Sequence, residues 1–285
     1  MKRKNILFTV KDYLVSGESF KVIWDEKRQR GKTLISSQID LSKYYSSKDY
    51  DSHKENKNGL IDQLYFAVQK MMFHYKAKVI NRYERGKKLL DYGSGIGKFG
   101  KYMTNLNYDV SLLEPNNKAR AYAKNQGLKS HRHITELHGG KQFNLISLWH
   151  VLEHLKDPEK VLFDLDELLA NEGKIFIAVP NLRSYDARFY KSCWAALDVP
   201  RHLWHFTTPS LKIMLKPLGY RLKAKHPLWF DSFYISYLSE KHLKTPWPLF
   251  RGIVIGLISN ISALFSGEYS SLIYIFEKTS SLSED

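Results

Sequence analysis

The sequence predicts an α/β protein built on a doubly wound sheet with helices on both faces, and three observations lead to this class. Apolar strands alternate with amphipathic helices through the middle of the chain, a pattern typical of a parallel sheet. A glycine-rich turn joins the first of these strands to the helix that follows it. Two late β-rich segments, 220–227 and 271–277, are joined by a long excursion and fit an antiparallel edge pair.

The composition is that of a globular protein. Of the 285 residues, 43% are hydrophobic and 26% charged, which excludes a disordered chain, a collagen and a coiled coil. The net charge of +15 suggests an anionic partner such as a nucleotide, a nucleic acid or an acidic membrane surface. Cys193 is the single cysteine, so no intrachain disulfide or four-cysteine zinc site can form. We expect no secretion signal, because charges interrupt the apolar run after residue 10, and we expect a cytoplasmic protein.

The first part of the chain, residues 1–75, is predicted to be an extension that ends in a lid helix. Residues 1–58 are polar and broken by glycines, and 46–53 are typical of a loop. From residue 60 onward, apolar side chains recur at steps of three and four, which predicts a long amphipathic helix leading into the main domain. These side chains are Ile61, Leu64, Tyr65, Val68, Met71, Met72, Tyr75 and Val79.

The main domain is predicted over residues 76–285. Asp157 and Pro158 supply the N-cap and first-turn proline of one helix, whose buried stripe includes Leu168 and Leu169 and which ends at 171–173. The other elements follow from apolar periodicity and glycine punctuation. They are strands at 87–92, 108–113, 129–133, 143–148 and 174–179, helices at 99–106, 117–125 and 208–215, and the two late segments named above.

A helical insertion is predicted at about 231–268. Its longest apolar stretch, 252–265, is amphipathic and shorter than the ~20 residues that cross a bilayer. Two interpretations stay open: a helix packed on the core, or an interfacial helix or acyl-substrate lid. The second would place the protein at the inner face of a membrane. It is favoured by nearby aromatic and basic residues, which are Trp247, Lys241, Lys244 and Arg251.

The strongest functional signal is the glycine loop after the strand at 87–92. Glycines let the backbone turn sharply and approach a ligand closely, and the following helix N-terminus offers N–H groups. Glu114 ends the next strand and can accept hydrogen bonds from a ribose diol. The pattern therefore indicates recognition of a nucleoside. The loop consists of Asp91, Tyr92, Gly93, Ser94, Gly95, Ile96 and Gly97.

The charge of Asp91 discriminates between two nucleoside cofactors. Gly95, Gly97 and Gly100 also match the dinucleotide fingerprint, so a nicotinamide enzyme is one alternative. A carboxylate at the mouth of the loop would repel a pyrophosphate but could hold an ammonium group. S-adenosyl-L-methionine carries an ammonium, a sulfonium and no phosphate, and is the expected cofactor. A glycine turn without a ligand is the remaining alternative.

These residues bring the chain close to a known family. It resembles class I S-adenosylmethionine-dependent methyltransferases of the small-molecule, lipid and quinone branch over about residues 85–225. The matches are DxGxGxG with a later acidic residue, the segment 143–155 against FDxIxxxxVLEHL, and the segment 198–207 against PRHLxHF. The resemblance implies a Rossmann-like seven-stranded sheet with an antiparallel last strand.

The resemblance also implies roles for individual residues. Asp91 and the loop glycines would hold the methionine end of the cofactor, and Glu114 would bind the ribose hydroxyls. His133 and Ile134 would lie near the adenine. His150 would border both cofactor and substrate.

Methyl transfer is a direct displacement, so the protein must mainly align the acceptor and exclude water. A hydroxyl acceptor gains from a neutral histidine that takes its proton. His202 is the favoured base, and each candidate also fits a structural role. The candidate bases are His150, His154, His202 and His205, and the candidate acceptor contacts are Arg201, Trp204 and His205.

We expect no metal. His150, Glu153 and His154 offer ligating groups, but the spacing is not HExxH and no further ligand is evident.

The acceptor is expected to be a hydroxyl of a small molecule, lipid, quinone precursor or saccharide. The [DN]PP[YF] tetrapeptide of amino-methylating enzymes is absent, and 149–152 stands in its place. An RNA methyltransferase is one alternative, motivated by the net charge, but no RNA-binding module is evident and nucleic acid is not an expected partner. An inactive scaffold is a second alternative, disfavoured by the intact loop. Peripheral membrane contact through 252–265 is a further expectation.

Overall fold

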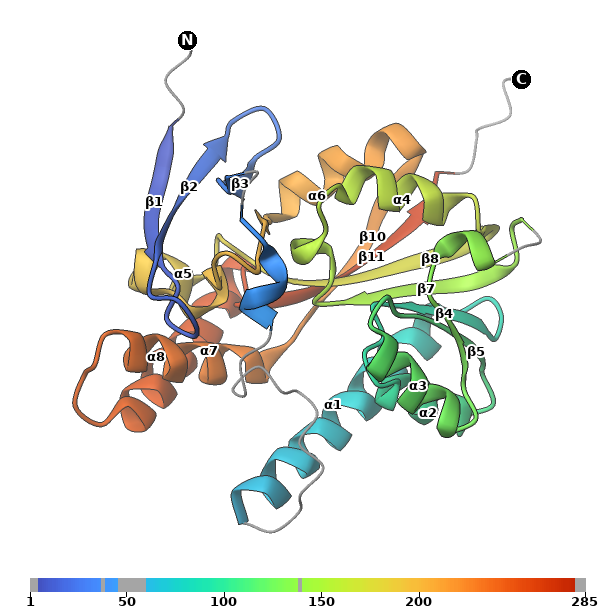
Figure 1. Ribbon diagram of the computed structural model, residues 1–285, viewed down its shortest axis with the longest axis horizontal. Coiled ribbons are helices and arrows are strands. Elements are labelled where there is room, and N and C mark those ends of the chain that lie inside the picture. The colour runs from blue at the N-terminus through green and yellow to red at the C-terminus, as the bar shows by residue number, and fades with distance from the viewer. Residues whose placement is uncertain (1–4, 37–38, 46–59, 138–139, 280–285) are drawn as a thin grey trace.

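The structure is a computed structural model that describes residues 5–36, 39–45, 60–137 and 140–279 (Figure 1). Its centre is a seven-stranded sheet in the order β10-β11-β8-β7-β4-β5-β6. Strands β4 to β8 run parallel, whereas β11 pairs antiparallel with both β8 and β10. The predicted Rossmann-like sheet with an antiparallel end is confirmed. The strands are β4 (Lys88–Tyr92), β5 (Asp109–Leu113), β6 (Lys129–His131), β7 (Phe143–Trp149), β8 (Leu169–Pro180), β10 (Tyr220–Pro227) and β11 (Ser271–Lys278).

Helices cover both faces of this sheet. On one face lie α1 (Leu60–Tyr83), α2 (Lys98–Thr104) and α3 (Asn117–Asn125), and on the other lie α4 (Pro158–Asp166) and α6 (Thr208–Leu215). Successive strand residues point to opposite faces. In β4, Leu89 packs toward α1 and α2, while Leu90 packs toward α4 and α6. Double burial explains why these strands are continuous apolar runs in the sequence.

The boundary between α4 and β8 differs from the prediction. The Asp157 side chain caps α4 by accepting a hydrogen bond from Lys160 N, as expected. However, α4 ends at Asp166, and Leu169 already pairs with Phe143 of β7. The prediction that the helix continues through Leu168 and Leu169 to 171–173 is therefore wrong. The apolar stripe continues without a break from helix into strand, so its periodicity does not mark the change.

The N-terminal region forms a second, antiparallel sheet, where the sequence predicted a broken, loop-like stretch. Its order is β1-β2-β3-β9, from β1 (Ile6–Lys11), β2 (Ser19–Asp25), β3 (Arg30–Thr33) and β9 (Trp204–His205). In β2, Phe20 and Val22 are buried and alternate with exposed residues, so one face packs on the body. Short strands with one polar face have an overall polar composition, which explains the error. The predicted loop at 46–53 lies outside the described residues.

The insertion is a helical hairpin of α7 (Trp229–His242) and α8 (Pro248–Ser266) beside α5 (Tyr185–Tyr190), below the N-terminal sheet in Figure 1. The buried positions of α8 are Gly252, Gly256, Ser259 and Ala263. Most of its large apolar side chains are exposed, whereas the half-buried Ile255 packs against the body. Helix α8 packs on α7 and α5, as one of the two interpretations of 252–265 expected, but it does so through its small residues and not through its apolar face.

Candidate active site

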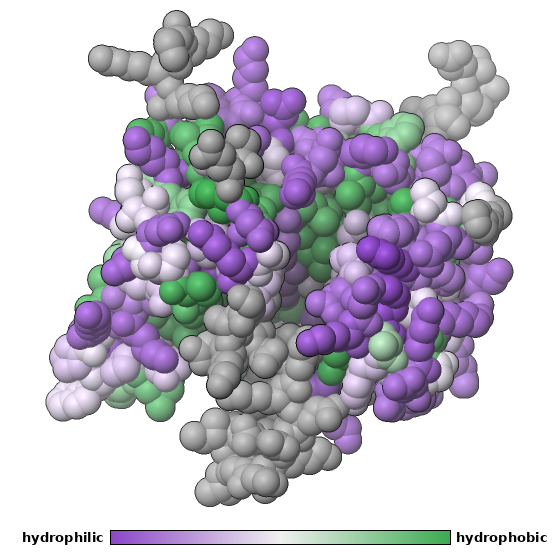
Figure 2. All heavy atoms as spheres, in the orientation of Figure 1, coloured by the Kyte–Doolittle hydropathy of each residue, from purple (hydrophilic) through white to green (hydrophobic). Residues whose placement is uncertain are grey.

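A cleft of about 880 Å³ opens where β4, β5 and β7 end. In the sheet, β4 lies between β5 and β7. From β4 the chain first adds β5 and β6 on one side and then crosses to β7 on the other side, so the cleft lies at the point where the strand order reverses. Figure 2 shows a hollow in the middle of this face with apolar residues at its floor and hydrophilic residues around it. The lining includes four residues predicted for cofactor binding besides the loop, which are Glu114, His133, Ile134 and His150.

The glycine loop forms one wall of the cleft. Gly93, Gly95 and Gly97 have φ values of 70°, 55° and 79°, which favour glycine. A Cβ on Gly93 would lie 2.5 Å from Val151 Cγ2, so this position allows no side chain. At Gly95 a Cβ would meet nothing within 4 Å, because this glycine borders the open cleft.

Glu114 is fastened to the same loop. Its Oε2 accepts a hydrogen bond from Gly95 N at 2.8 Å, and its Oε1 accepts one from Asn116 N at 2.8 Å. Each carboxylate oxygen keeps a further lone pair for a ligand. The glycine loop and the acidic residue of the second strand are therefore joined directly, and the predicted binding of a ribose by Glu114 stays a prediction.

Asp91 lies beneath the loop and is almost fully buried. Ser147 Oγ donates to its Oδ1 at 2.7 Å. Burial raises the pKa of Asp91 to about 6, against the effects of Ser147 and Lys76. Lys76 of α1 reaches the site over the Trp149 ring, with Nζ 4.5 Å from the ring centroid. Sequence reasoning missed Lys76 and Ser147, which precede and follow the loop by many residues.

The residues present fit S-adenosylmethionine. Glu114 lines the cleft, and the buried Asp91 lies beneath the glycine loop next to it. Two carboxylates at separate points suit a ligand with an ammonium at one end and a ribose diol further on. Two buried polar atoms, Ser94 Oγ in the loop and Trp149 Nε1 beside it, have no hydrogen-bond partner among the residues that the structure describes. Trp149 also lines the cleft. Groups of this kind favour a polar ligand at this place.

His150 sits between two carboxylates at the edge of the cleft. Its Nε2 lies 3.4 Å from Asp231 Oδ2, and its Nδ1 lies 3.4 Å from Glu153 Oε1. Burial opposes the charge, but these carboxylates outweigh it and raise the pKa of His150 to about 9. At neutral pH His150 is therefore an imidazolium. Asp231, in the first turn of α7, was not among the predicted site residues.

His154 is the predicted candidate base that borders the cleft as a neutral ring. It follows β7 in a short 3-10 turn, Leu152–His154. Burial and the neighbouring His202 lower the pKa of His154 to about 4. Its Nδ1 lies 3.1 Å from the carbonyl oxygen of Arg201, which assigns the proton to Nδ1 and the lone pair to Nε2. Tyr45 from the N-terminal region lines the cleft beside it and was also missed.

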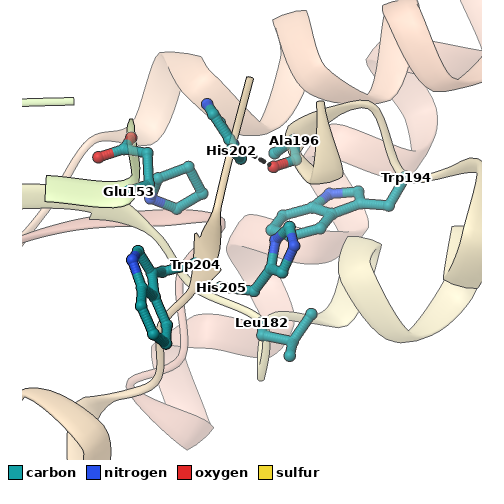
Figure 3. A pocket seen from close by; sticks show the side chains of 8 residues that line it. Glu153, Leu182, Trp194, Ala196, His202, Trp204 and His205 are labelled. Atoms are coloured by element: carbon teal, nitrogen blue, oxygen red, sulfur yellow. Dashed lines mark hydrogen bonds between the residues drawn. The ribbon is translucent and has the colours of Figure 1, made fainter. Parts of the chain in front are cut away.

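His202 and His205 lie behind His154, in a small inner cavity shown in Figure 3. His202 Nδ1 lies 2.8 Å from the Ala196 carbonyl oxygen, and the His202 ring packs against His154 at 4.6 Å between centroids. His205 Nε2 lies 2.9 Å from Thr33 Oγ1, and burial lowers the pKa of His205 to about 3. Neither residue lines the main cleft.

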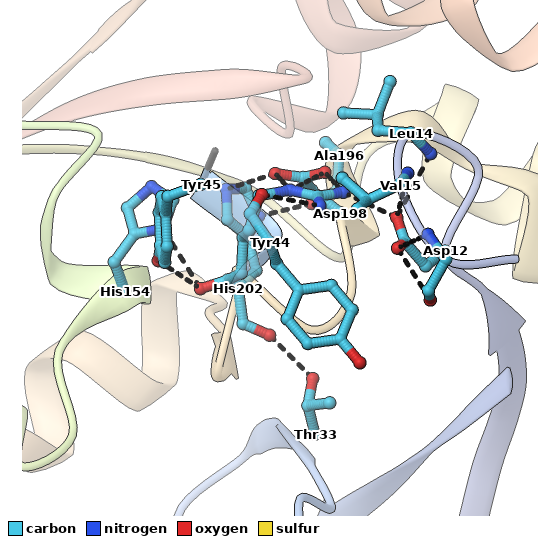
Figure 4. Close-up of polar contacts among 12 residues, drawn as sticks. Asp12, Leu14, Val15, Thr33, Tyr44, Tyr45, His154, Ala196, Asp198 and His202 are labelled. Atoms are coloured by element: carbon cyan, nitrogen blue, oxygen red, sulfur yellow. Dashed lines mark hydrogen bonds and ion pairs between the residues drawn. The ribbon is translucent and has the colours of Figure 1, made fainter. Parts of the chain in front are cut away.

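Arg201 and Trp204 hold the N-terminal sheet against the domain. Arg201 Nη2 donates to Asp12 Oδ1 at 3.0 Å and to Asp198 Oδ1 at 2.6 Å. Figure 4 shows Asp12 and Asp198 in the polar network at this place. Trp204 Nε1 donates to the Leu155 carbonyl at 2.8 Å, and the Arg30 guanidinium stacks on its ring. Both residues are buried and lie away from the lining of the cleft, and their predicted role in acceptor binding stays a prediction.

One group of side chains in the described part of the chain could hold a metal ion. Donor atoms of Glu153, His154 and His202 all lie within 4.8 Å of one another. The Glu153 carboxylate is 1% exposed. Among the described residues it forms the ion pair with His150 but accepts no hydrogen bond. The sequence analysis considered His150, Glu153 and His154 as ligating groups. It did not include His202, because His202 comes from a distant segment of the chain.

The glycine turn lies over the buried Asp91, and Glu114 of the next strand is hydrogen-bonded to that turn. On this fold, the combination defines an S-adenosylmethionine-dependent methyltransferase of class I. Residues 68–225 match a family described as a methyltransferase domain. The match spans more than half of the chain, and the protein belongs to that family. No curated protein matches the sequence significantly.

Solved structures share the fold. The chain is similar to the magnesium protoporphyrin IX methyltransferase of Synechocystis PCC 6803, solved with bound S-adenosylhomocysteine, at 11% identity and a TM-score of 0.54, covering 83% of this chain and 97% of that one. It is also similar to a possible histamine N-methyltransferase from Thermotoga maritima, at 14% identity and a TM-score of 0.52, covering 76% and 94%. At these identities the likeness concerns the fold.

Proposed function

We propose that this methyltransferase transfers a methyl group to a hydroxyl group of a small molecule, lipid, quinone precursor or saccharide. The observation that carries the proposal is His154, a neutral imidazole that lines the cofactor cleft and whose lone pair is assigned to Nε2. A hydroxyl must lose its proton as its oxygen is methylated, and a neutral imidazole can accept that proton. The two solved structures named above do not decide the acceptor, because their names give different substrates.

S-adenosylmethionine supplies an electrophilic methyl group on a sulfonium. Asp91 would hold the ammonium end and Glu114 the ribose end of the cofactor, and this anchoring would set the direction from which an acceptor must approach. His154 accepts the hydroxyl proton at Nε2, while the Arg201 carbonyl keeps the ring oriented through Nδ1. His150 remains protonated between Asp231 and Glu153 and positions the turn that carries His154. His202 supports the His154 ring from behind, and its predicted role as the base stays a prediction.

The test is a methyl-acceptance screen with S-adenosylmethionine labelled in the methyl group, against lipid, quinone-precursor and glycan extracts. The expected product is a methyl ether, which keeps its label in alkali. Label released by alkali as methanol, or found on an amine, would contradict the hydroxyl assignment.

The base is tested in the active extract with His154→Ala and His202→Ala, and with the exposed His74→Ala as the control. His154→Ala should lower kcat by about 10²- to 10⁴-fold, with affinity for S-adenosylhomocysteine unchanged. Because the pKa of His154 is about 4, this group should cause no loss of rate between about pH 8 and about pH 5. A larger loss of kcat in His202→Ala than in His154→Ala would assign the base to His202.

A further inference from the structure

The α7–α8 hairpin reverses the usual rule of burial. The buried positions of α8 are small residues, while all of its large apolar residues except the half-buried Ile255 are exposed, with Phe265 89% and Leu264 70% exposed. Monomeric soluble proteins rarely expose a continuous apolar face of this kind. The exposed large side chains of α8 are Leu249, Phe250, Ile253, Val254, Leu257, Ile258, Ile261, Leu264 and Phe265.

The two helices approach each other through small residues. A Cβ on Gly252 would lie 2.6 Å from Tyr237 Cα, and one on Gly256 would lie 2.8 Å from Phe233 Cα. The inward face of α7 is lined by buried serines, Ser232, Ser236 and Ser239. Helices that pack through glycine and serine with their apolar side chains outward are typical of a lipid environment, where apolar surface carries no solvation cost.

The charges around this face complement an anionic surface. Between 232 and 267 the exposed charged residues are Lys241, Lys244 and Arg251. The one acidic residue there, Glu240, is fully buried and accepts a hydrogen bond from Arg251 Nε at 2.8 Å. Trp247 is 78% exposed at the start of α8, where an aromatic ring suits the boundary between lipid and water.

Contacts with the domain indicate how the hairpin is oriented. The 19 residues of α8 make it long and apolar enough to cross a membrane, although 252–265 was predicted to be too short. However, Ser259 Oγ donates to Asp186 Oδ1 of α5 at 2.7 Å, in the middle of the helix. Helix α8 is thus fastened to the domain at a point well inside the helix, which favours a helix lying in the membrane plane.

We propose that the α7–α8 hairpin docks flat on an anionic lipid membrane, with the outward face of α8 inserted among the acyl chains and Lys241 and Lys244 at the headgroups. Asp231, in the first turn of α7, contacts His150 at the edge of the cofactor cleft. The root of the hairpin therefore borders the cleft. If the proposed methyl transfer is correct, the hydroxyl acceptor belongs to a lipid or to a headgroup presented at the membrane surface.

The experiment is co-sedimentation of the full chain with phosphatidylcholine vesicles with and without phosphatidylglycerol. The first variant carries Phe250→Ser, Leu257→Ser and Leu264→Ser. The matched control carries Leu106→Ser, Phe163→Ser and Ile213→Ser, three exposed apolar residues elsewhere. The hairpin variant should lose about 100-fold or more in vesicle affinity, and the control should bind like wild type.

The charge component is tested with Lys241→Gln and Lys244→Gln together. Their loss should weaken binding to anionic vesicles by about 30-fold at low salt. Equal binding to vesicles with and without the anionic lipid would overturn the assignment of an anionic surface.

Two other results would overturn membrane docking. One is equal vesicle affinity of the hairpin variant and the control. The other is a wild-type dimer that becomes a monomer in the hairpin variant, without vesicle binding, which would assign the face to a second copy of the chain. Titration of both variants with S-adenosylhomocysteine separates this proposal from the methyl transfer, since cofactor binding should survive in both.

Discussion

The central sheet and the α7–α8 hairpin use the same residue types in opposite ways. In the sheet, leucine, isoleucine and phenylalanine are buried between two helical layers. In the hairpin, the same types are exposed and the small residues are inside. The difference shows that hydropathy alone does not say which face of a helix is buried. The neighbouring surface decides which face is buried. The sheet has protein on both sides, whereas we propose that the outward face of the hairpin meets lipid.

The two regions share one packing device. Gly93 in the loop meets the Val151 side chain, and Gly256 in α8 meets the backbone of Phe233, both without room for a Cβ. At the loop, close approach shapes a wall of the cofactor cleft. In the hairpin, it joins two helices whose apolar residues are turned outward. In both regions, glycine allows a close approach that a side chain would prevent.

The largest effect expected from this contrast is on stability. Leu145→Ala removes a fully buried side chain of β7 and should lower the free energy of unfolding by ~2–5 kcal/mol. Leu257→Ala removes an exposed side chain of α8 and should change it by less than ~0.5 kcal/mol. Denaturant unfolding in the absence of lipid measures both. A comparable loss in the two variants would mean that the outward face of α8 is covered in solution.

The second effect concerns cofactor binding, which depends on the sheet and not on the hairpin. Glu114→Gln removes the charge of the ribose-side carboxylate and should weaken affinity for S-adenosylhomocysteine by ~10- to 100-fold, as expected for hydrogen bonds to a charged group. Asp91→Ala should weaken it as well. Isothermal titration is the measurement, and the exposed Glu167→Gln is the control. Wild-type affinity in both site variants would refute the cofactor assignment.

The third effect tests the packing inside the hairpin. Alanine normally stabilises a helix relative to glycine by ~0.5–1 kcal/mol. Gly256→Ala should instead destabilise the protein by ~1–3 kcal/mol, because the added Cβ lies 2.8 Å from Phe233 Cα. Ser262→Ala, on the same helix, is the matched control. Thermal unfolding that shows Gly256→Ala to be stabilised would contradict the close approach of the two helices.

The smallest effect is a pH dependence at the point where hairpin and cleft meet. The raised pKa of His150, about 9, means that its stabilising contribution is complete below about pH 6.5 and is lost as the pH rises toward 9. Asp231→Asn removes one of the two carboxylates that raise it, so Tm should fall less between pH 7 and pH 9 than in wild type. Asp164→Asn, which breaks a surface pair with Lys160, is the control. Parallel Tm curves for wild type and Asp231→Asn would show that this contact contributes nothing.

The sequence by itself determined the parts of this protein that are local or periodic. Alternating apolar runs predicted the parallel strands, and the glycine loop with Glu114 predicted one wall of the cofactor site, because both depend on residues close together in the chain. Lys76, Asp231 and Tyr45 reach the site from segments far away, so no spacing pattern indicated them. The N-terminal sheet was hidden because its strands are short and have a polar face. Only the tertiary structure decided which face of α8 is covered, because an amphipathic pattern marks two faces while the surrounding surfaces decide which of them is buried.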